Sequence, residues 1–174
     1  MIRITNLNEK FTPISNKGGS ITIAFDYEAV YDVDNNGNKV ETNIGTWSVH
    51  TFVKVPSFGQ LKDFILSEIN NRVDEKILSG YVWRDMPVWL SSENQFNYKA
   101  AYDLAVMSEG KSLPVVFKFG TSEKPVYHQF TELAELNDFY IGAMNHINNC
   151  LQEGWRKKDN IDWREYEETL NKLN

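Results

Sequence analysis

Residues 21–53, ITIAFDYEAVYDVDNNGNKVETNIGTWSVHTFV, decide the fold of the N-terminal third of the chain. Every second residue over 21–33 is apolar or aromatic, which is the alternation of a β-strand with one buried face. Asn36-Gly37 predicts a tight turn after that strand, because both central residues of a type I′ turn need positive φ. The alternation of the return strand changes register near Gly45, so we expect a β-bulge there. The stretch therefore predicts one long antiparallel hairpin.

The rest of the chain alternates between helical and extended patterns. Residues 1–7 are compatible with a third strand beside the hairpin. Apolar residues at helical spacing over 61–77 predict a helix that Ser57 can cap. Short extended runs over 81–90 and 113–130 predict a strand pair and a second hairpin. Helices follow each of these extended runs, which gives the order βββ-α-ββ-α-ββ-α-α.

The sequence also indicates where the three C-terminal helices begin or end, and which side of one of them faces the core. Ser92 followed by Gln95 matches a capping box, and Gly154 and Asp159 are expected to end the long helix and to open the last one. In the helix after Ser92 we expect the core-facing stripe to consist of Phe96, Ala100, Leu104 and Met107.

These elements predict an α+β fold in which antiparallel β-hairpins pack with three to four helices. We expect an N-terminal β-hairpin region over residues 1–56, which could serve as an assembly arm, and an α+β domain over residues 57–174. A long two-stranded hairpin needs neighbours to be stable, and its edges invite pairing with another chain.

Composition narrows the classes of function. The formal net charge is −6 and no long lysine-arginine cluster occurs, so nucleic acid is not an expected partner. A single cysteine allows neither an internal disulfide nor a cysteine zinc site. No apolar run in the sequence approaches the length of a membrane span. We expect no signal peptide. We expect a location in a virion or a host cytoplasm.

Two local patterns could carry chemistry. Asp32, Asp34 and Asn36 reproduce the first half of a calcium loop, although position twelve, where a glutamate should close the site, is Asn43. Aspartate and asparagine are also common at any hairpin tip. His146 and Cys150 lie four residues apart and share a helix face, as a base and its thiol nucleophile could, but a small apolar residue is also expected at position 150.

Aromatic residues offer a further binding surface. Trp83, Trp89, Tyr98 and Trp155 could form a stacking platform for a sugar or a partner surface, or fill the core. The phosphate-binding loop, the dinucleotide glycine fingerprint, the G-x-S-x-G elbow and histidine metal spacings do not occur in the sequence. We therefore expect no cofactor.

Part of the sequence resembles a known family. The stretches VWLSSENQFNYKAAYDLA (88–105), LPVVFKFG (113–120), VYHQFTELAELNDFY (126–140) and CLQEGWRKKDNIDW (150–163) resemble a domain of unknown function found in bacteriophages and gut bacteria. The resemblance covers about residues 80 to 170 and includes no motif residue that carries chemistry. It implies a phage-associated structural or accessory part, such as one of the tail.

Three classes of function remain open. The first is a non-enzymatic structural or accessory protein of a phage particle or phage-like assembly, whose partners are other protein subunits and could include further copies of itself. The second is a small glycan- or calcium-binding module. The third is a cysteine hydrolase or transferase built on His146 and Cys150.

Overall fold

The computed structural model describes residues 2–6, 12–17 and 19–173. These residues form an α+β fold with four helices and several antiparallel strand pairs. The chain divides into two compact units. Residues 1–69 and 157–174 make up the first, here called the sheet unit, and residues 70–156 make up the second, here called the helical unit. These compact units do not test whether residues 1–56 and 57–174 are separate domains, so that division stays a prediction.

The sheet unit is built on a four-stranded antiparallel sheet with strand order β1-β4-β3-β2. The expected hairpin is confirmed as β3 (Ser20–Val33) and β4 (Lys39–Phe52). The third strand expected near the N-terminus is β1 (Ile2–Asn6), which pairs with β4. The sequence patterns did not predict β2 (Ile14–Lys17), which pairs with the start of β3.

Two irregularities interrupt the pairing of β3 with β4. One lies beside Gly45, where Ala29 pairs with Gly45 but Tyr31 pairs with Glu41; this is the predicted bulge. The other was not predicted and lies in β3, between the residues paired as Phe25↔Ser48 and Glu28↔Thr46.

The hairpin contributes to the core only through the half that lies farther from its turn. Ile21, Ile23 and Phe25 pack with residues of two helices, α1 (Phe58–Ser79) and α4 (Trp163–Asn171). In the half of the hairpin nearer the turn, the apolar side chains of Tyr31 and Val33 are 55% and 64% exposed. The strand alternation therefore correctly predicted a strand, but not where its burial stops.

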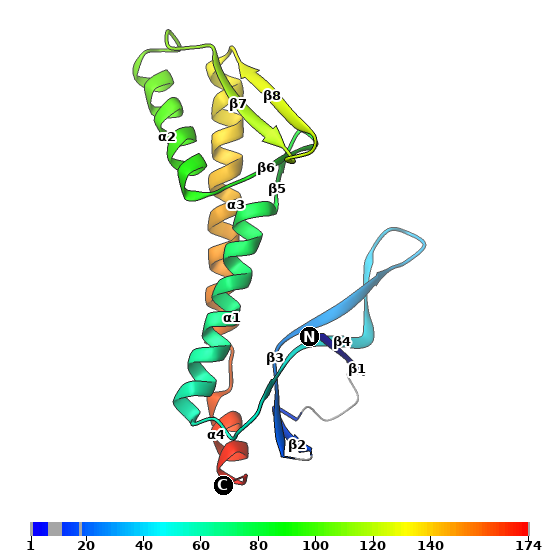
Figure 1. The fold of residues 1–174 in the computed structure, drawn as a ribbon. Helices are drawn as coiled ribbons and strands as arrows, with labels where there is room; N and C mark the ends of the chain where they lie inside the picture. Colours follow the sequence, from blue (N-terminus) through cyan, green and yellow to red (C-terminus); the bar gives the residue numbers. More distant parts are fainter. Residues whose placement is uncertain (1, 7–11, 18, 174) are drawn as a thin grey trace. The chain divides into compact units, whose positions relative to one another are not determined.

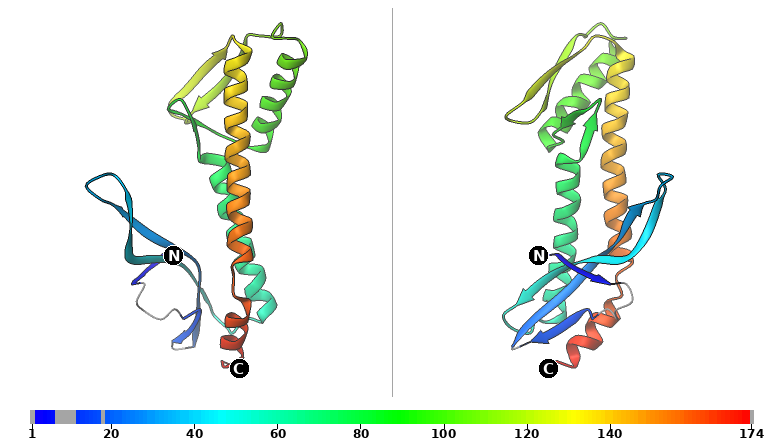
Figure 2. Two further views of the ribbon diagram at one scale, coloured as in Figure 1. Left: turned by 180° about the vertical axis from the view of Figure 1, so that it is seen from behind. Right: turned by 90° about the vertical axis from the view of Figure 1, so that its right-hand side faces the viewer.

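The helical unit surrounds an aromatic core. Its elements are the C-terminal part of α1, β5 (Tyr81–Trp83), β6 (Met86–Val88), α2 (Ser92–Met107), β7 (Val115–Gly120), β8 (Pro125–Phe130) and most of α3 (Leu133–Asp159). Figures 1 and 2 show α2 and the β7–β8 hairpin beside the N-terminal half of α3. Phe139 of α3 is fully buried and its ring contacts those of Trp83, Tyr98, Phe117 and Phe130.

The predicted end of the long helix is wrong. Gly154 lies inside α3, is buried, and faces Val73 of α1, so that a Cβ atom at position 154 would lie 2.5 Å from Val73 Cγ2. Glycine is present here because the two helices approach closely. Asp159 is the last residue of α3, and the cap of α4 is Asp162, which accepts hydrogen bonds from the Arg164 and Glu165 amides.

The caps of the first two helices are of the expected chemical type. Ser57 and Gln60 form a reciprocal capping box at α1, in which the Gln60 amide donates to Ser57 Oγ over 3.2 Å and the Ser57 amide donates to Gln60 Oε1 over 2.9 Å. At α2 the cap is Ser91, which accepts from the Asn94 amide, and Ser92 is the first helical residue. The predicted cap was therefore wrong by one position.

The predicted inward face of α2 is also wrong. Phe96, Leu104 and Met107 are 73%, 57% and 83% exposed, and Ala100 is exposed as well. Tyr98 and Ala105 on the opposite side of the helix are buried in the core instead. α2 thus has two apolar faces, of which its own unit covers one.

Candidate functional site

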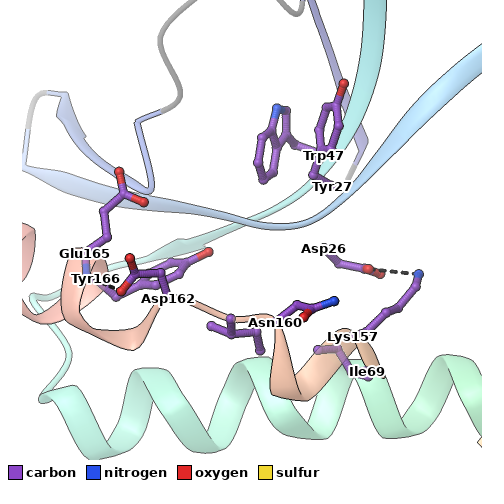
Figure 3. Close-up of a pocket in the computed structure, with 10 residues that line it drawn as sticks. Asp26, Tyr27, Trp47, Ile69, Lys157, Asn160, Asp162, Glu165 and Tyr166 are labelled. Atoms are coloured by element: carbon purple, nitrogen blue, oxygen red, sulfur yellow. Dashed lines mark hydrogen bonds and ion pairs between the residues drawn. The ribbon is translucent and has the colours of Figure 1, made fainter. Parts of the chain in front are cut away.

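A pocket of about 380 Å³ lies in the sheet unit, beside the unpredicted bulge of β3 (Figure 3). Strands β3 and β4, helix α1, the end of α3 and the start of α4 contribute its walls. The lining residues are Asp26, Tyr27, Trp47, Ile69, Lys157, Asn160, Ile161, Asp162, Glu165 and Tyr166.

The bulge directs Asp26 into this pocket. Asp26 has a φ of 51°, in the left-handed region that residues other than glycine seldom adopt. Such bulges commonly redirect a side chain next to a functional site. The side chain of Asp26 is only 2% exposed, and backbone strain at a buried carboxylate is a reason to test the site for function.

Lys157 neutralises the buried carboxylate. Its Nζ lies 2.8 Å from Asp26 Oδ1 and also pairs with Glu28 Oε1. Burial by itself would lower the pKa of Lys157, but the hydrogen bonds to Asp26 and Glu28 outweigh burial and raise the pKa above its ordinary value. Lys157 therefore remains a fully charged ammonium across the neutral pH range.

Aromatic rings form one wall of the pocket. The rings of Tyr27 and Trp47 lie 4.6 Å apart between centroids, and Tyr27 packs on Gly45, where any side chain would collide with the ring. The buried Tyr27 hydroxyl has no hydrogen-bond partner within the described parts of the chain. On the opposite wall, Tyr166 donates from its hydroxyl to the Ala24 carbonyl oxygen over 2.7 Å, which ties α4 to β3.

The four predicted stacking residues lie in two different environments. Trp83 and Tyr98 are 5% and 3% exposed and belong to the aromatic core of the helical unit. The indole of Trp83 donates to Asp138 Oδ2 over 3.1 Å, so its polar atom is satisfied internally. Trp89 and Trp155 are 52% and 57% exposed and lie on different elements, just before α2 and near the end of α3.

At the predicted calcium loop, the carboxylates serve the hairpin turn. Asp34 Oδ1 accepts from the Asn36 and Asn38 amides over 2.8 Å each, and Asp34 Oδ2 accepts from the Asn38 side chain. These hydrogen bonds, chiefly those from Asn38, lower the pKa of Asp34. Asp32 accepts from the Val33 amide. No carboxylate, histidine or cysteine group among the described residues has the geometry to hold a metal ion.

The His146–Cys150 pair exists, in a buried setting. Cys150 Sγ lies 3.6 Å from His146 Nε2, and the same nitrogen lies 2.9 Å from the Lys76 carbonyl oxygen. Cys150 is 7% exposed, and burial raises the pKa of its thiol. The thiol is therefore held in its protonated, weakly nucleophilic form.

Sequence patterns did not identify Asp26, Trp47 or Lys157 as a site. Asp26 and Tyr27 continue the strand alternation without a visible break, so nothing local reveals the bulge. Lys157 belongs to a short basic run, but its partners are far away in sequence, with Glu28 separated from it by 129 positions.

The fold and the pocket describe a small α+β protein with a polar, aromatic-walled cavity. The family model of the Domain of unknown function (DUF4376) matches residues 60–171. The chain belongs to this family, and β1–β4 lie before the matched region. No curated protein and no solved structure matches the chain significantly. Within the described parts of the chain, no helix has the length and apolar character required to cross a membrane.

Proposed function

We propose that the protein is a non-enzymatic structural or accessory component of an assembly, and that it acts through protein–protein contacts made by the outer face of α2. The earlier resemblance to a domain found in bacteriophages makes a phage particle or a phage-like assembly the proposed setting. The single observation that carries the proposal is the uncovered apolar face of α2.

This outer face consists of Phe96, Ala100, Leu104 and Met107, which follow one another along one side of the helix. A helix on the surface of a monomer ordinarily presents polar residues to water, and isolated exposed apolar residues need no explanation. An aligned apolar row is different, because it marks a surface that another molecule covers.

We infer that a second copy of this chain covers the outer face of α2, because the face can be complementary to itself. Lys99 and Asp103 form an ion pair along one edge of the face, with Nζ 2.7 Å from Oδ2. In an antiparallel pair related by a two-fold axis, each edge of the helix meets the same edge of the other helix. A two-fold axis that crosses the outer face midway between the levels of Lys99 and Asp103 sets each Lys99 opposite Asp103 of the second copy and each Phe96 near its Met107. In this arrangement, opposite charges face each other and apolar side chains contact apolar side chains of the second copy.

Sedimentation velocity over a wide concentration range tests this pairing. We expect the wild-type protein to dimerise, and Phe96→Lys and Leu104→Lys to be monomeric but folded, because both side chains are exposed. Ile141→Lys is the matched control, since Ile141 is 48% exposed but lies on α3. A wild-type protein that stays monomeric up to its solubility limit would refute the self-pairing.

Charge exchange tests the antiparallel arrangement separately. Lys99→Asp should weaken the dimer, because it places two carboxylates opposite each other across the axis. The double variant Lys99→Asp/Asp103→Lys should restore it. Equal dimerisation by the single and the double variants would show that these edges do not meet.

A further inference from the structure

We propose that the pocket beside Asp26 binds an organic cation, a protonated amine or a guanidinium group. This proposal concerns the sheet unit and is independent of the α2 face. It rests on the charges that line the pocket, on its aromatic wall and on the polar groups left open in it.

The balance of charge among the lining residues favours cations over anions. The carboxylates of Asp26, Asp162 and Glu165 line the pocket, and Lys157 is its one lysine or arginine among the described lining residues. The Lys157 ammonium is already paired with Asp26 and with Glu28. Asp162 caps α4 and lies 3.9 Å from the Arg164 guanidinium. Glu165 is therefore the lining carboxylate without a basic partner among the described residues, and a cation entering the pocket meets its negative charge.

A bare metal ion does not fit this arrangement. The carboxylates come from three separate elements, β3, the α3–α4 connection and α4, and no group of them among the described residues has metal-holding geometry. Divalent cations require several oxygens within a short coordination distance. A larger cation, whose hydrogen-bond donors are spread over several atoms, can reach carboxylates that are apart.

The open polar groups have the chemistry to accept such donors. Figure 3 shows the side chains of Asn160 and Glu165 on either side of Tyr166. Neither the Asn160 amide nor the Glu165 carboxylate hydrogen-bonds to another side chain within the described ranges. A charged donor that binds a carboxylate makes a stronger hydrogen bond than a neutral one.

The aromatic wall adds a second source of affinity for a cation. Trp47 and Tyr166 both line the pocket, and the face of an aromatic ring attracts an ammonium or guanidinium group, with tryptophan the strongest. A volume of about 380 Å³ is at the small end of the range for ligand sites. It suits a polyamine segment or one basic side chain of a partner.

Calorimetric titration of the full-length protein tests the proposal with charged and neutral probes of one shape. The probes are acetyl-arginine amide and its uncharged isostere acetyl-citrulline amide, with spermidine as a free polyamine and glucose as a neutral sugar. We expect the arginine probe or spermidine to bind, the citrulline and glucose probes not to bind, and salt to weaken binding. Which of the two cations binds more tightly distinguishes a basic side chain from a free polyamine as the natural ligand.

A matched pair of variants locates the binding. Glu165→Gln removes one charge from the pocket and should weaken cation binding about threefold. Glu168→Gln makes the same change on the same helix, outside the pocket, and should leave binding unchanged. The indole N–H resonance of Trp47 should shift on titration, and should be absent in Trp47→Phe.

Several results would overturn the proposal. They are the absence of binding by both cations, equal binding of the arginine and citrulline probes, binding of glucose in preference to the cations, or equal effects of the two glutamine substitutions.

Discussion

Replacing Gly154 by alanine measures how closely α1 and α3 approach within the helical unit. In an exposed helix, Gly→Ala stabilises by about 1 kcal/mol, because alanine has the higher helix propensity. Here the new Cβ would lie 2.5 Å from Val73 Cγ2, far inside the ordinary carbon–carbon contact of about 3.5 to 4.0 Å. The two effects oppose each other, so the sign of the change decides which one dominates.

The collision is expected to dominate. Val73 is β-branched and lies inside α1, where its χ1 angle is strongly restricted. The methyl group therefore cannot swing aside, and the helices must separate or the side chain must leave its rotamer. Overpacking of this kind costs about 1 to 3 kcal/mol. After the propensity gain is subtracted, Gly154→Ala should lower the free energy of unfolding by about 1 kcal/mol.

A double-mutant cycle with Val73→Ala isolates the contact. Val73 is partly buried, so its truncation alone should cost about 1 kcal/mol. In the double variant the new methyl group at position 154 fills the space that the valine leaves, and stability should return to near that of the wild type. The coupling energy should then be about 2 kcal/mol, within the range for residues in direct contact.

Urea unfolding followed by far-ultraviolet circular dichroism gives all four free energies of the cycle. The expected result is two destabilised single variants and a double variant that is more stable than either. Gly154→Ala that stabilises the protein, with additive effects in the cycle, would mean that the helices do not meet at this position and that glycine is there for another reason.

Four further substitutions test the core, a cap and a buried phenol. Phe139→Ala removes the fully buried ring at the centre of the aromatic core and should lower the unfolding free energy by about 3 to 5 kcal/mol; a loss below about 1 kcal/mol, close to that of a surface change, would contradict that position. Ser91→Ala should lower the unfolding free energy by about 1 kcal/mol, and Ser92→Ala should leave it nearly unchanged. If thermal unfolding shows Ser92→Ala to be the more destabilised variant, Ser91 is not the cap. Burial raises the pKa of Tyr98 to about 12 from 10.0. Its contribution to stability is therefore complete below pH 10 and is lost as the pH rises toward 12. Urea titrations at pH values across this interval should show a smaller loss for Tyr98→Phe than for the wild type.

Local patterns predicted the elements that local interactions determine. The β3–β4 hairpin, its bulge beside Gly45 and the cap at Ser57 each depend on residues close in sequence, so alternation, turn chemistry and capping preferences were sufficient to predict them. The predicted α+β class followed from them. The prediction that Gly154 ends the long helix was wrong, because a glycine at a helix end and a glycine in close contact with a neighbouring helix look alike in sequence. Only the partner, Val73, distinguishes the two cases.

The pocket was beyond local patterns for a related reason. Its central ion pair joins Asp26 to Lys157, and no periodicity links two such distant positions. Among the predicted binding residues, Trp83 and Tyr98 lie in the core, whereas Trp89 and Trp155 are exposed. Aromatic composition cannot separate these outcomes, because the same ring serves a core or a surface equally well.

The error at α2 follows from a real property of its sequence. Phe96, Ala100, Leu104 and Met107 satisfy helical spacing, and so does the opposite set around Tyr98 and Ala105. Helical periodicity reports that a face is apolar, but it does not say which molecule covers it. The core takes the tyrosine face, because Tyr98 packs edge-on against Phe139 with ring centroids 5.0 Å apart. The larger apolar side chains are then left to water. A helix that is apolar on both sides is what a subunit needs if one side holds its fold together and the other holds it to a neighbour, and this is why the charge-exchange experiment at Lys99 and Asp103 bears directly on the proposed function.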